Sequence, residues 1–578
     1  MKRVVALLLL ASPVFAADVV MHHNTPARTG AVLDETLLTP AAIKAQDFGR
    51  LFSLVVDGQV YAQPLVVSNL DIPGKGTRNV VFLATMRNVV YAYDADGRDA
   101  APLWKTSLGG PMPFDRIPKD AGAQLGQYNI RPYIGITSTP VIDRAKGRMY
   151  VVAKIAEPAC PGVGDTTPEC PVEYRIHAID ILTGEIVRRA PIEIPMRNPD
   201  VRPGDVARRH LQRAALLLAN NRVYVAFGAH QDAPPFQGWL MSFDPDTLLP
   251  ADPVFCTTPD GEMGGIWQAG NGPAADDAGN LYFMTGNGSF DPTAQRYANS
   301  VLKLGASLNF ISAFTPANVD ALTLLDIDLG SAGPMLLPGT KQLVGGGKQG
   351  RLYLLDRDGP GGQQPHHWWR EGNDPPVQYF QASRPWRISW LSWFPALFNI
   401  GYHHIHGSPV YWDGPKGPMI YVWPEEDNVR GYRYDAARGK FDTHPIKGVM
   451  GNQGMPGGFL SISANGRQDG VLWAAIPAQN DAWVEIVRGS MRAFRADTLE
   501  LLWSTDANDA ADNFDFAKNV PPTIANGKVY LATFSDRVNV YGLHSPFAAS
   551  QTLPKVSRNP RHRGHIKGAT GHGGHGKH

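Results

Sequence analysis

The chain has 578 residues, with 54 Lys and Arg against 53 Asp and Glu, and a formal net charge of +1 at pH 7. Because the two signs nearly balance and no basic stripe runs through the body of the chain, the composition argues against a nucleic-acid-binding protein. The high content of glycine (60 residues) and proline (48 residues) is typical of many short strands joined by turns.

Residues 1–16 have the pattern of a secretory signal peptide. Lys2 and Arg3 precede a short apolar run, and Val14-Phe15-Ala16 supplies small residues at the minus-three and minus-one positions of a cleavage site. The apolar run is too short to span a bilayer, and no cysteine near the cleavage point could carry a lipid. We therefore predict an exported protein, periplasmic or extracellular, that is not a lipoprotein and has no transmembrane segment.

Residues 17–49 precede the first repeat and are predicted to form an N-terminal arm. Thr39 followed by Pro40 predicts the start of a helix, with Thr39 as its cap. His22 and His23 are adjacent, so on a strand their side chains would point to opposite faces, which is poor geometry for sharing a metal. We interpret them as structural or solvated histidines.

A strand-turn-strand unit first appears at residues 79–96 and organises the rest of the chain. An apolar, β-branched run is followed by a turn at Arg87-Asn88 and then by residues that alternate with a period of two. The second strand of this unit recurs eight times, beginning at Val89, Ile176, Leu240, Val301, Leu352, Val429, Met491 and Val538. Such repeats cannot bury both faces alone, which predicts blades stacked around an axis.

We predict an all-β fold, an eight-bladed β-propeller over residues 50–546, with seven blades as the alternative count. Each blade is expected to be a four-stranded antiparallel sheet. The last repeat, from Val538, has no following strand, and residues 50–56 have no preceding one. Pairing these two segments would close the ring and remove two open sheet edges.

Three segments depart from the blade rhythm. Cys160 and Cys170 flank a proline- and glycine-rich loop and could form a disulfide in an oxidising compartment. Residues 360–404 hold five of the thirteen tryptophans and form either a lid or apolar binding surface, or an excursion that packs on its own blade. Residues 547–578 are rich in His, Gly and basic residues, so we expect a disordered tail, either merely solvated or a weak metal binder.

The residues just ahead of each innermost strand should line the mouth of the central channel. They are mostly polar and lie a blade apart in the sequence: Gln63, Thr139, Gln212, Arg213, Asn271, Ser331, His406, Met455, Lys518 and Asn519. Of these, Gln63, Asn271 and Ser331 are candidates for contacts to a cofactor. We expect His406 and Gln63 to line one common cavity.

Histidines form the richest local pattern. His404 and His406 are two residues apart, so in an extended segment their imidazoles share one face and could bind a metal or act as a base and its partner. With Arg213 they are the candidates for catalysis. His210 and His230, from another blade, could complete a metal site with His406. The alternative is that these histidines hydrogen-bond neighbouring loop carbonyls.

Two more residues are candidates for holding a ligand. Lys348 lies in the glycine-rich stretch 345–351, where a backbone without side chains allows close approach of an anion, although the P-loop pattern is absent. Its simpler interpretation is a hairpin turn. Trp267 follows two glycines and could stack on a planar ligand or wedge between blades.

Several stretches resemble known propellers. AYDADGRDAAPLW, AIDILTGEIV and AFRADTLELLW resemble the blade signature of the quinoprotein alcohol dehydrogenase-like superfamily. DGQVYAQPLVV, GGIWQAGNGPAAD, DLGSAGP and HIHGSPVYW resemble secreted bacterial PQQ-like β-propeller repeat proteins, and the resemblance covers nearly all of residues 20–543. It implies a propeller fold, and it makes pyrroloquinoline quinone (PQQ) and Ca²⁺ candidate cofactors, although the superfamily also includes non-enzymatic scaffolds.

One departure from the dehydrogenases guides the choice of function. The chain lacks the adjacent cysteine pair that covers the quinone in those enzymes. We therefore favour an exported propeller that binds a small molecule, a polysaccharide or a protein in its funnel. The alternatives are a PQQ- and Ca²⁺-dependent dehydrogenase of alcohols or sugars, and a carbohydrate-active enzyme such as a polysaccharide lyase.

Overall fold

The computed structural model describes residues 17–544, apart from 119–129, 157–170, 197, 359–375, 386–402, 452–453, 484 and 509–511. The chain divides into two units between Leu543 and His544, and the fold described here belongs to the first. The predicted signal peptide, the Cys160–Cys170 disulfide and the tail all lie outside the described residues.

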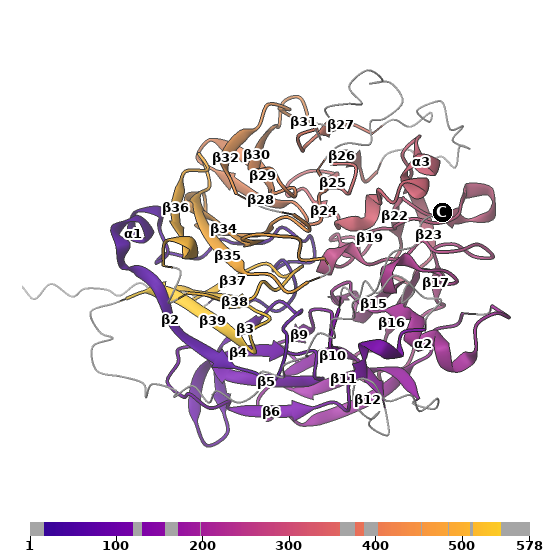
Figure 1. The fold of residues 1–578 in the computed structure, drawn as a ribbon, viewed down its shortest axis with the longest axis horizontal. Helices are drawn as coiled ribbons and strands as arrows, with labels where there is room; N and C mark the ends of the chain where they lie inside the picture. The colour runs from indigo at the N-terminus through magenta and orange to yellow at the C-terminus, as the bar shows by residue number, and fades with distance from the viewer. Residues whose placement is uncertain are drawn as a thin grey trace, which may run out of the picture. The chain divides into compact units, whose positions relative to one another are not determined.

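Eight sheets of four or five strands lie side by side around a common centre, so the predicted eight-bladed, all-β propeller is confirmed (Figure 1). Blades 1 to 4 consist of β3 (Leu65–Ile72), β4 (Gly76–Ala84), β5 (Val89–Asp94), β6 (Trp104–Ser107); β9 (Val141–Asp143), β10 (Arg148–Ala156), β11 (Val172–Asp180), β12 (Ile186–Ile192); β13 (His210–Leu211), β14 (Leu217–Ala219), β15 (Arg222–Ala229), β16 (Trp239–Phe243), β17 (Phe255–Cys256); and β18 (Ala274–Ala275), β19 (Leu281–Met284), β22 (Val301–Leu304), β23 (Phe310–Phe314).

Blades 5 to 8 continue the ring, and the last of them contains a strand from near the N-terminus. They consist of β24 (Met335–Leu336), β25 (Gln342–Gly346), β26 (Arg351–Asp356), β27 (Gln378–Gln381); β28 (Val410–Gly414), β29 (Gly417–Val422), β30 (Asn428–Asp435), β31 (Lys440–Phe441), β32 (Ile446–Met450); β33 (Phe459–Asn465), β34 (Gln468–Pro477), β35 (Gly489–Arg495), β36 (Leu501–Ser504); and β37 (Thr523–Ala525), β38 (Lys528–Ala532), β39 (Arg537–Leu543), β2 (Phe48–Val55).

The outermost strand of blade 8, β2, comes from the N-terminal part of the chain, ahead of blade 1 in the sequence. β2 pairs antiparallel with β39, and Arg50 lies opposite Tyr541 in the register. The predicted pairing of residues 50–56 with the last repeat is therefore present. It covers the edge of β39, which would otherwise expose unpaired backbone groups.

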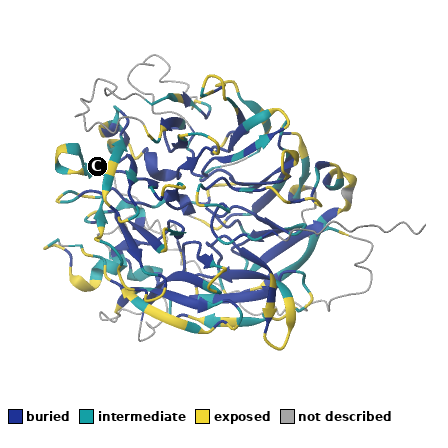
Figure 2. Ribbon diagram, turned by 180° about the vertical axis from the view of Figure 1, so that it is seen from behind, coloured by how far each residue is buried: buried dark blue, intermediate teal, exposed yellow. Residues whose placement is uncertain are grey.

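The turn Asp180-Ile181-Leu182-Thr183-Gly184, which has the pattern Asp-x-x-Thr-Gly, packs blade 2 against blade 1. Asp180 Oδ1 accepts hydrogen bonds from the backbone of Leu182 and Thr183, which tightens the turn after β11. Gly184 follows with φ +76°, and a Cβ there would lie 2.6 Å from the ring of Trp104 in blade 1. The Trp104 indole also donates to the Ile181 carbonyl at 3.1 Å. The signature thus joins the outer parts of neighbouring blades, while buried strands form the interior (Figure 2).

The N-terminal arm threads the centre of the ring. Backbone hydrogen bonds of 2.8–2.9 Å join it to the inner strands of six blades, through Val66, Ile142, Ala275, Leu336, Tyr411 and Ile462. The short strand β1 (Ala31–Val32) adds to β33 in parallel. Arg28, fully buried, donates to the carbonyls of His22, Leu216 and Pro273 and so ties blades 3 and 4 to the arm. The sequence predicted the arm but not this central position.

Helical segments are few and short. Helix α1 (Pro40–Ala42) begins where predicted, with the Thr39 hydroxyl accepting from the Ala42 backbone at 3.1 Å. In the described residues the other α-helices are α2 (Val206–Arg209) and α3 (Val319–Leu324), and a π-helix (Ile43–Asp47) and several 3-10 turns accompany them. No helix in the described ranges is both long and apolar enough to cross a lipid bilayer. Within the segment 360–404, residues 378–381 form β27, the outer strand of blade 5, and the tryptophans lie outside the described residues.

Candidate functional site

A pocket with about 650 Å³ of open space lies where loops from blades 3 to 8 meet. These loops come from two kinds of position: just ahead of an innermost strand, and just after a second strand. Both reach the same end of the ring because successive strands in a blade are antiparallel. The lining residues are Leu211, Arg213, Ala229, Gln231, Asp232, Trp267, Asp326, Lys348, His406, Pro456, Trp483, Lys518 and Asn519.

Arg213 is the most unusual residue of the pocket. Its side chain is buried, yet it forms no hydrogen bond or ion pair with any residue in the described part of the chain, and its Nε is buried without a partner. Its guanidinium carbon lies 5.9 Å from the centre of the Tyr61 ring. Burial lowers the pKa of Arg213 only to about 10, so it is charged at neutral pH. A buried, unpaired charge is strongly unfavourable.

Two other basic side chains, Lys518 and His406, stand near Arg213, and the pKa of each is lowered. Lys518 Nζ donates to the carbonyls of Ala482 at 2.8 Å and Trp483 at 3.0 Å, and burial together with Arg213 holds its pKa well below the usual value. Burial, with His404 nearby, likewise holds the pKa of His406 well below its usual range, so its imidazole is neutral at pH 7. This end of the pocket therefore favours a negative charge.

Acidic side chains gather around Lys348 on the other side of the pocket. Its Nζ lies 2.9 Å from Asp326 Oδ1 and 2.7 Å from Asp328 Oδ2, and Asp232 belongs to the same carboxylate group. Burial opposes the charge on Lys348, but the two aspartates raise its pKa overall. Burial and the neighbouring Asp328 raise the pKa of Asp232 well above its usual value. The pocket thus has an acidic side and a basic side.

Trp267 lies between the two sides. Lys348 Nζ is 5.9 Å from the centre of its indole ring, and the His406 ring is 6.3 Å away. The indole Nε1 is buried without a hydrogen-bond partner within the described residues. The tryptophan therefore supplies an apolar face and a free donor to the pocket.

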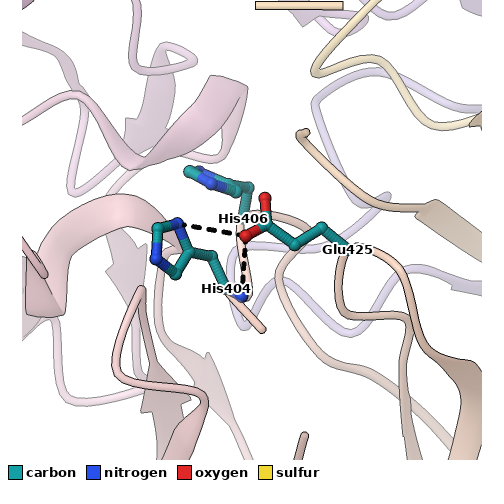
Figure 3. A group of neighbouring side chains, drawn as sticks. All are labelled: His404, His406 and Glu425. Carbon is teal, nitrogen blue, oxygen red and sulfur yellow. Dashed lines mark hydrogen bonds and ion pairs between the residues drawn. The ribbon is translucent and has the colours of Figure 1, made fainter. Parts of the chain in front are cut away.

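A second group of polar side chains borders the pocket at His406. His404 and His406, on the loop before β28, face Glu425 from the turn between β29 and β30, and one atom from each lies within 4.8 Å of the others (Figure 3). His404 Nδ1 is 3.3 Å from Glu425 Oε1, which also accepts from the His404 backbone N–H at 3.1 Å.

Arg213, Trp267, Lys348 and His406 thus share one pocket, whereas three candidates for cofactor contacts do not line it. Gln63 Oε1 accepts from the His23 backbone in the arm at 3.1 Å, Asn271 donates to Ser408 Oγ, and Ser331 donates to the Ile405 carbonyl. Gln63 is not among the residues that line this pocket with His406, so a cavity that the two share stays a prediction.

The metal site of three histidines, His210, His230 and His406, stays a prediction. Two of its members have other neighbours in the structure: His210 Nδ1 lies 2.8 Å from the Val206 carbonyl, and His230 Nε2 lies 2.9 Å from Lys154 Nζ. Among the described residues, the groups that could hold a metal are His404, His406 and Glu425, and Asp232, Asp326 and Asp328.

The acidic residues of the site were missed from the sequence. Asp232 and Glu425 stand just after second strands, in β15–β16 and β29–β30 connections. His230 and Lys348 were identified at positions of the same kind, but no acidic residue there was. The order of the strands could have identified these residues. In an antiparallel blade, the loop after the second strand lies at the same end of the ring as the start of the first strand.

The comparisons with known proteins bear on the fold. No family model matches the sequence, and neither does any curated protein. Among solved structures, the chain is similar to the quinohemoprotein alcohol dehydrogenase ADHIIG from Pseudomonas putida HK5 (TM-score 0.53, 15% identity, 94% of this chain and 82% of that chain). It is also similar to a europium-containing methanol dehydrogenase (TM-score 0.55, 13% identity, 91% of this chain and 98% of that chain).

The chain has the propeller fold of the quinoprotein dehydrogenases. Such low identities show the fold alone, so the cofactors must be judged from the residues present. Ca²⁺ takes six to eight oxygen ligands. In the described residues the acids Asp232, Asp326 and Asp328 could supply some of them, but the Lys348 ammonium already lies against two of these carboxylates. The residues present therefore do not fit a calcium ion there.

Proposed function

We propose that this protein is an exported binding protein whose pocket holds a small organic anion. Arg213 carries the proposal. A buried guanidinium without an acidic partner is left uncompensated in the described structure, and a carboxylate or phosphate group on a ligand would supply the missing counter-ion through two parallel hydrogen bonds.

The rest of the pocket supports a ligand with further groups. Trp267 offers an apolar ring face on which a planar or cyclic body would pack. On the far side, Asp232 and Asp326 offer oxygens that would accept hydrogen bonds from hydroxyl or amino groups. A ring that carries a carboxylate at one end and hydroxyl groups at the other, such as a sugar acid or an aromatic acid, satisfies both sides.

Isothermal titration calorimetry of the full chain against citrate, glucuronate, PQQ and inorganic phosphate, all in buffer freed of metal ions with a chelating resin, tests this function. At least one anion should bind, and the variant Arg213→Met should bind it at least about 100-fold more weakly, as expected for a lost charge-assisted pair. Arg438→Met, which removes a largely exposed arginine, is the control. Equal binding by Arg213→Met and the wild type would refute the proposal.

A dehydrogenase is the second candidate, and the shared fold together with Asp232 favours it. Asp232 is a half-buried carboxyl with a raised pKa beside the indole of Trp267, and a Cβ at Gly286 would lie 3.1 Å from Trp267 Nε1 and 3.6 Å from Asp232 Oδ2. Reduction of a dye by protein mixed with PQQ, Ca²⁺ and an alcohol would show this activity. Binding of PQQ without dye reduction would support the binding protein instead.

A further inference from the structure

His404, His406 and Glu425 form a compact group of metal-ligating side chains at the edge of the pocket. The two histidines stand on one extended segment, and the Glu425 carboxylate reaches toward them from the neighbouring turn (Figure 3). The His404 and His406 rings lie 5.9 Å apart, centre to centre.

The facing atoms of this group are buried and lack donors. His406 is 2% exposed and Glu425 6% exposed. His404 Nδ1, His406 Nε2 and Glu425 Oε2 have no hydrogen-bond partner among the described residues. Lys348 does not neutralise Glu425, because its ammonium is paired with Asp326 and Asp328. Buried polar atoms are normally satisfied, so the unpartnered His406 Nε2 and Glu425 Oε2, with His404 Nδ1 only 3.3 Å from Glu425 Oε1, indicate a missing cation.

We propose that His404, His406 and Glu425 bind a divalent transition-metal ion. Two imidazoles and one carboxylate suit Zn²⁺, Fe²⁺, Ni²⁺ or Cu²⁺, whereas Ca²⁺ and Mg²⁺ prefer oxygen ligands throughout. Tetrahedral Zn²⁺ with bonds of about 2.0–2.1 Å needs ligand atoms about 3.3 Å apart. The present atoms, within 4.8 Å of one another, need only small side-chain rotations to reach that spacing.

Three protein ligands leave a coordination position open. His406 also lines the pocket that contains Arg213 and Lys348, so the open position faces the space where the organic anion of the proposed function would sit. A carboxylate held by Arg213 could complete the coordination. This last step rests on the proposed function, but the binding of the metal itself does not.

Metal titrations of the full chain test the site. The five histidines of the tail, His562, His565, His572, His575 and His578, are replaced by Asn in the background protein so that the tail contributes no ligands. After dialysis against EDTA, Co²⁺ is added and its visible absorption is followed, and Zn²⁺ is then used to displace it. We expect one site per chain, with the absorption typical of low coordination number and nitrogen ligands.

The variants decide the assignment. Glu425→Gln and His406→Ala should each weaken Zn²⁺ binding more than about 100-fold, because each removes a direct ligand. His403→Ala is the matched control, since the His403 ring accepts from Arg384 Nε at 3.1 Å and is outside the group. If His406→Ala does not fold, Glu425→Gln, which keeps the size of the side chain, tests the site instead. Metal binding that is absent, or unchanged in these variants, overturns the proposal.

The two proposals fail separately. Anion binding is measured in metal-free buffer and depends on Arg213, whereas Co²⁺ and Zn²⁺ are titrated without any organic anion and depend on Glu425. Loss of one signal with the other intact therefore shows which proposal is wrong.

Discussion

The guanidinium of Arg213 lies over the ring of Tyr61, 5.9 Å from its centre, and this cation–π contact is the one stabilising partner of the charge that the described structure provides. Such a contact is worth about 2 kcal/mol when desolvated, well below the penalty for burying an unpaired charge. The contact with Tyr61 therefore offsets only a small part of the cost of burying the Arg213 charge.

Replacing Arg213 should make the ligand-free protein no less stable. In Arg213→Met an apolar side chain of similar length replaces the buried charge, so we expect the free energy of unfolding to stay the same or to rise by about 1–2 kcal/mol. Urea unfolding in buffer freed of metal ions with a chelating resin, without organic anions, measures this. A loss of several kcal/mol would show that Arg213 has a structural partner and is not held ready for a ligand.

Removing Lys348 should have the opposite effect. Lys348→Met leaves the fully buried carboxylate of Asp328 without its cation, so we expect a loss of about 3 kcal/mol at pH 7. The double variant Lys348→Met with Asp328→Asn removes both charges and should regain most of that loss in the same urea assay. If the single variant matched the wild type, the ion pair would not stabilise this side of the pocket.

The arm should contribute strongly to stability through Arg28. Arg28→Leu removes the donors to three buried carbonyls, of His22, Leu216 and Pro273, and we expect a loss of about 3 kcal/mol or more. Arg438→Leu, at a largely exposed arginine, should change stability by less than about 0.5 kcal/mol. Thermal unfolding of both variants compares them, and equal melting temperatures would mean that the arm is not needed to hold the ring together.

His210 should make stability fall on acidification. Burial lowers the pKa of His210 to about 4 from the usual 6.5, so the folded protein binds a proton less readily than the unfolded chain. The stability that this residue contributes is complete above pH 6.5 and is lost as the pH falls toward 4, by up to about 3 kcal/mol.

The variant His210→Asn isolates this effect. Its amide can still donate to the Val206 carbonyl but does not titrate, so the curve of unfolding free energy against pH should become flatter between pH 6.5 and 4. His444→Asn, at a histidine side chain that is 94% exposed, should leave the curve unchanged. If the unfolding free energy of His210→Asn fell with pH as steeply as that of the wild type, the attribution of this pH dependence to His210 would be wrong.

Much of the fold could be predicted from the sequence because each blade carries its own local signals. The alternation after Val89 and the turn at Asp180 to Gly184 act within a few residues, so they reveal strands, turns and the number of blades. The path of the arm could not be predicted, because backbone groups make most of its hydrogen bonds to the inner strands, and backbone groups leave no pattern in the sequence.

The site was predicted in part. Arg213, Lys348, Trp267 and His406 were identified because they are polar or aromatic residues beside recognisable strands. Asp232 and Glu425 were not identified, although Lys348 lies in the same kind of connection after a second strand. The direction of the strands brings Asp232 and Glu425 to the pocket. That Arg213 is buried and has no acidic partner can be seen only in the folded chain.

The location of a bound anion tests the central claim most directly. A crystal structure of the full chain, grown with the anion that binds most tightly in calorimetry, would place the ligand. We predict a carboxylate or phosphate oxygen about 2.8 Å from the Arg213 guanidinium, with the body of the ligand against Trp267. A ligand bound elsewhere, or an Arg213 side chain paired with a protein carboxylate, would contradict the account.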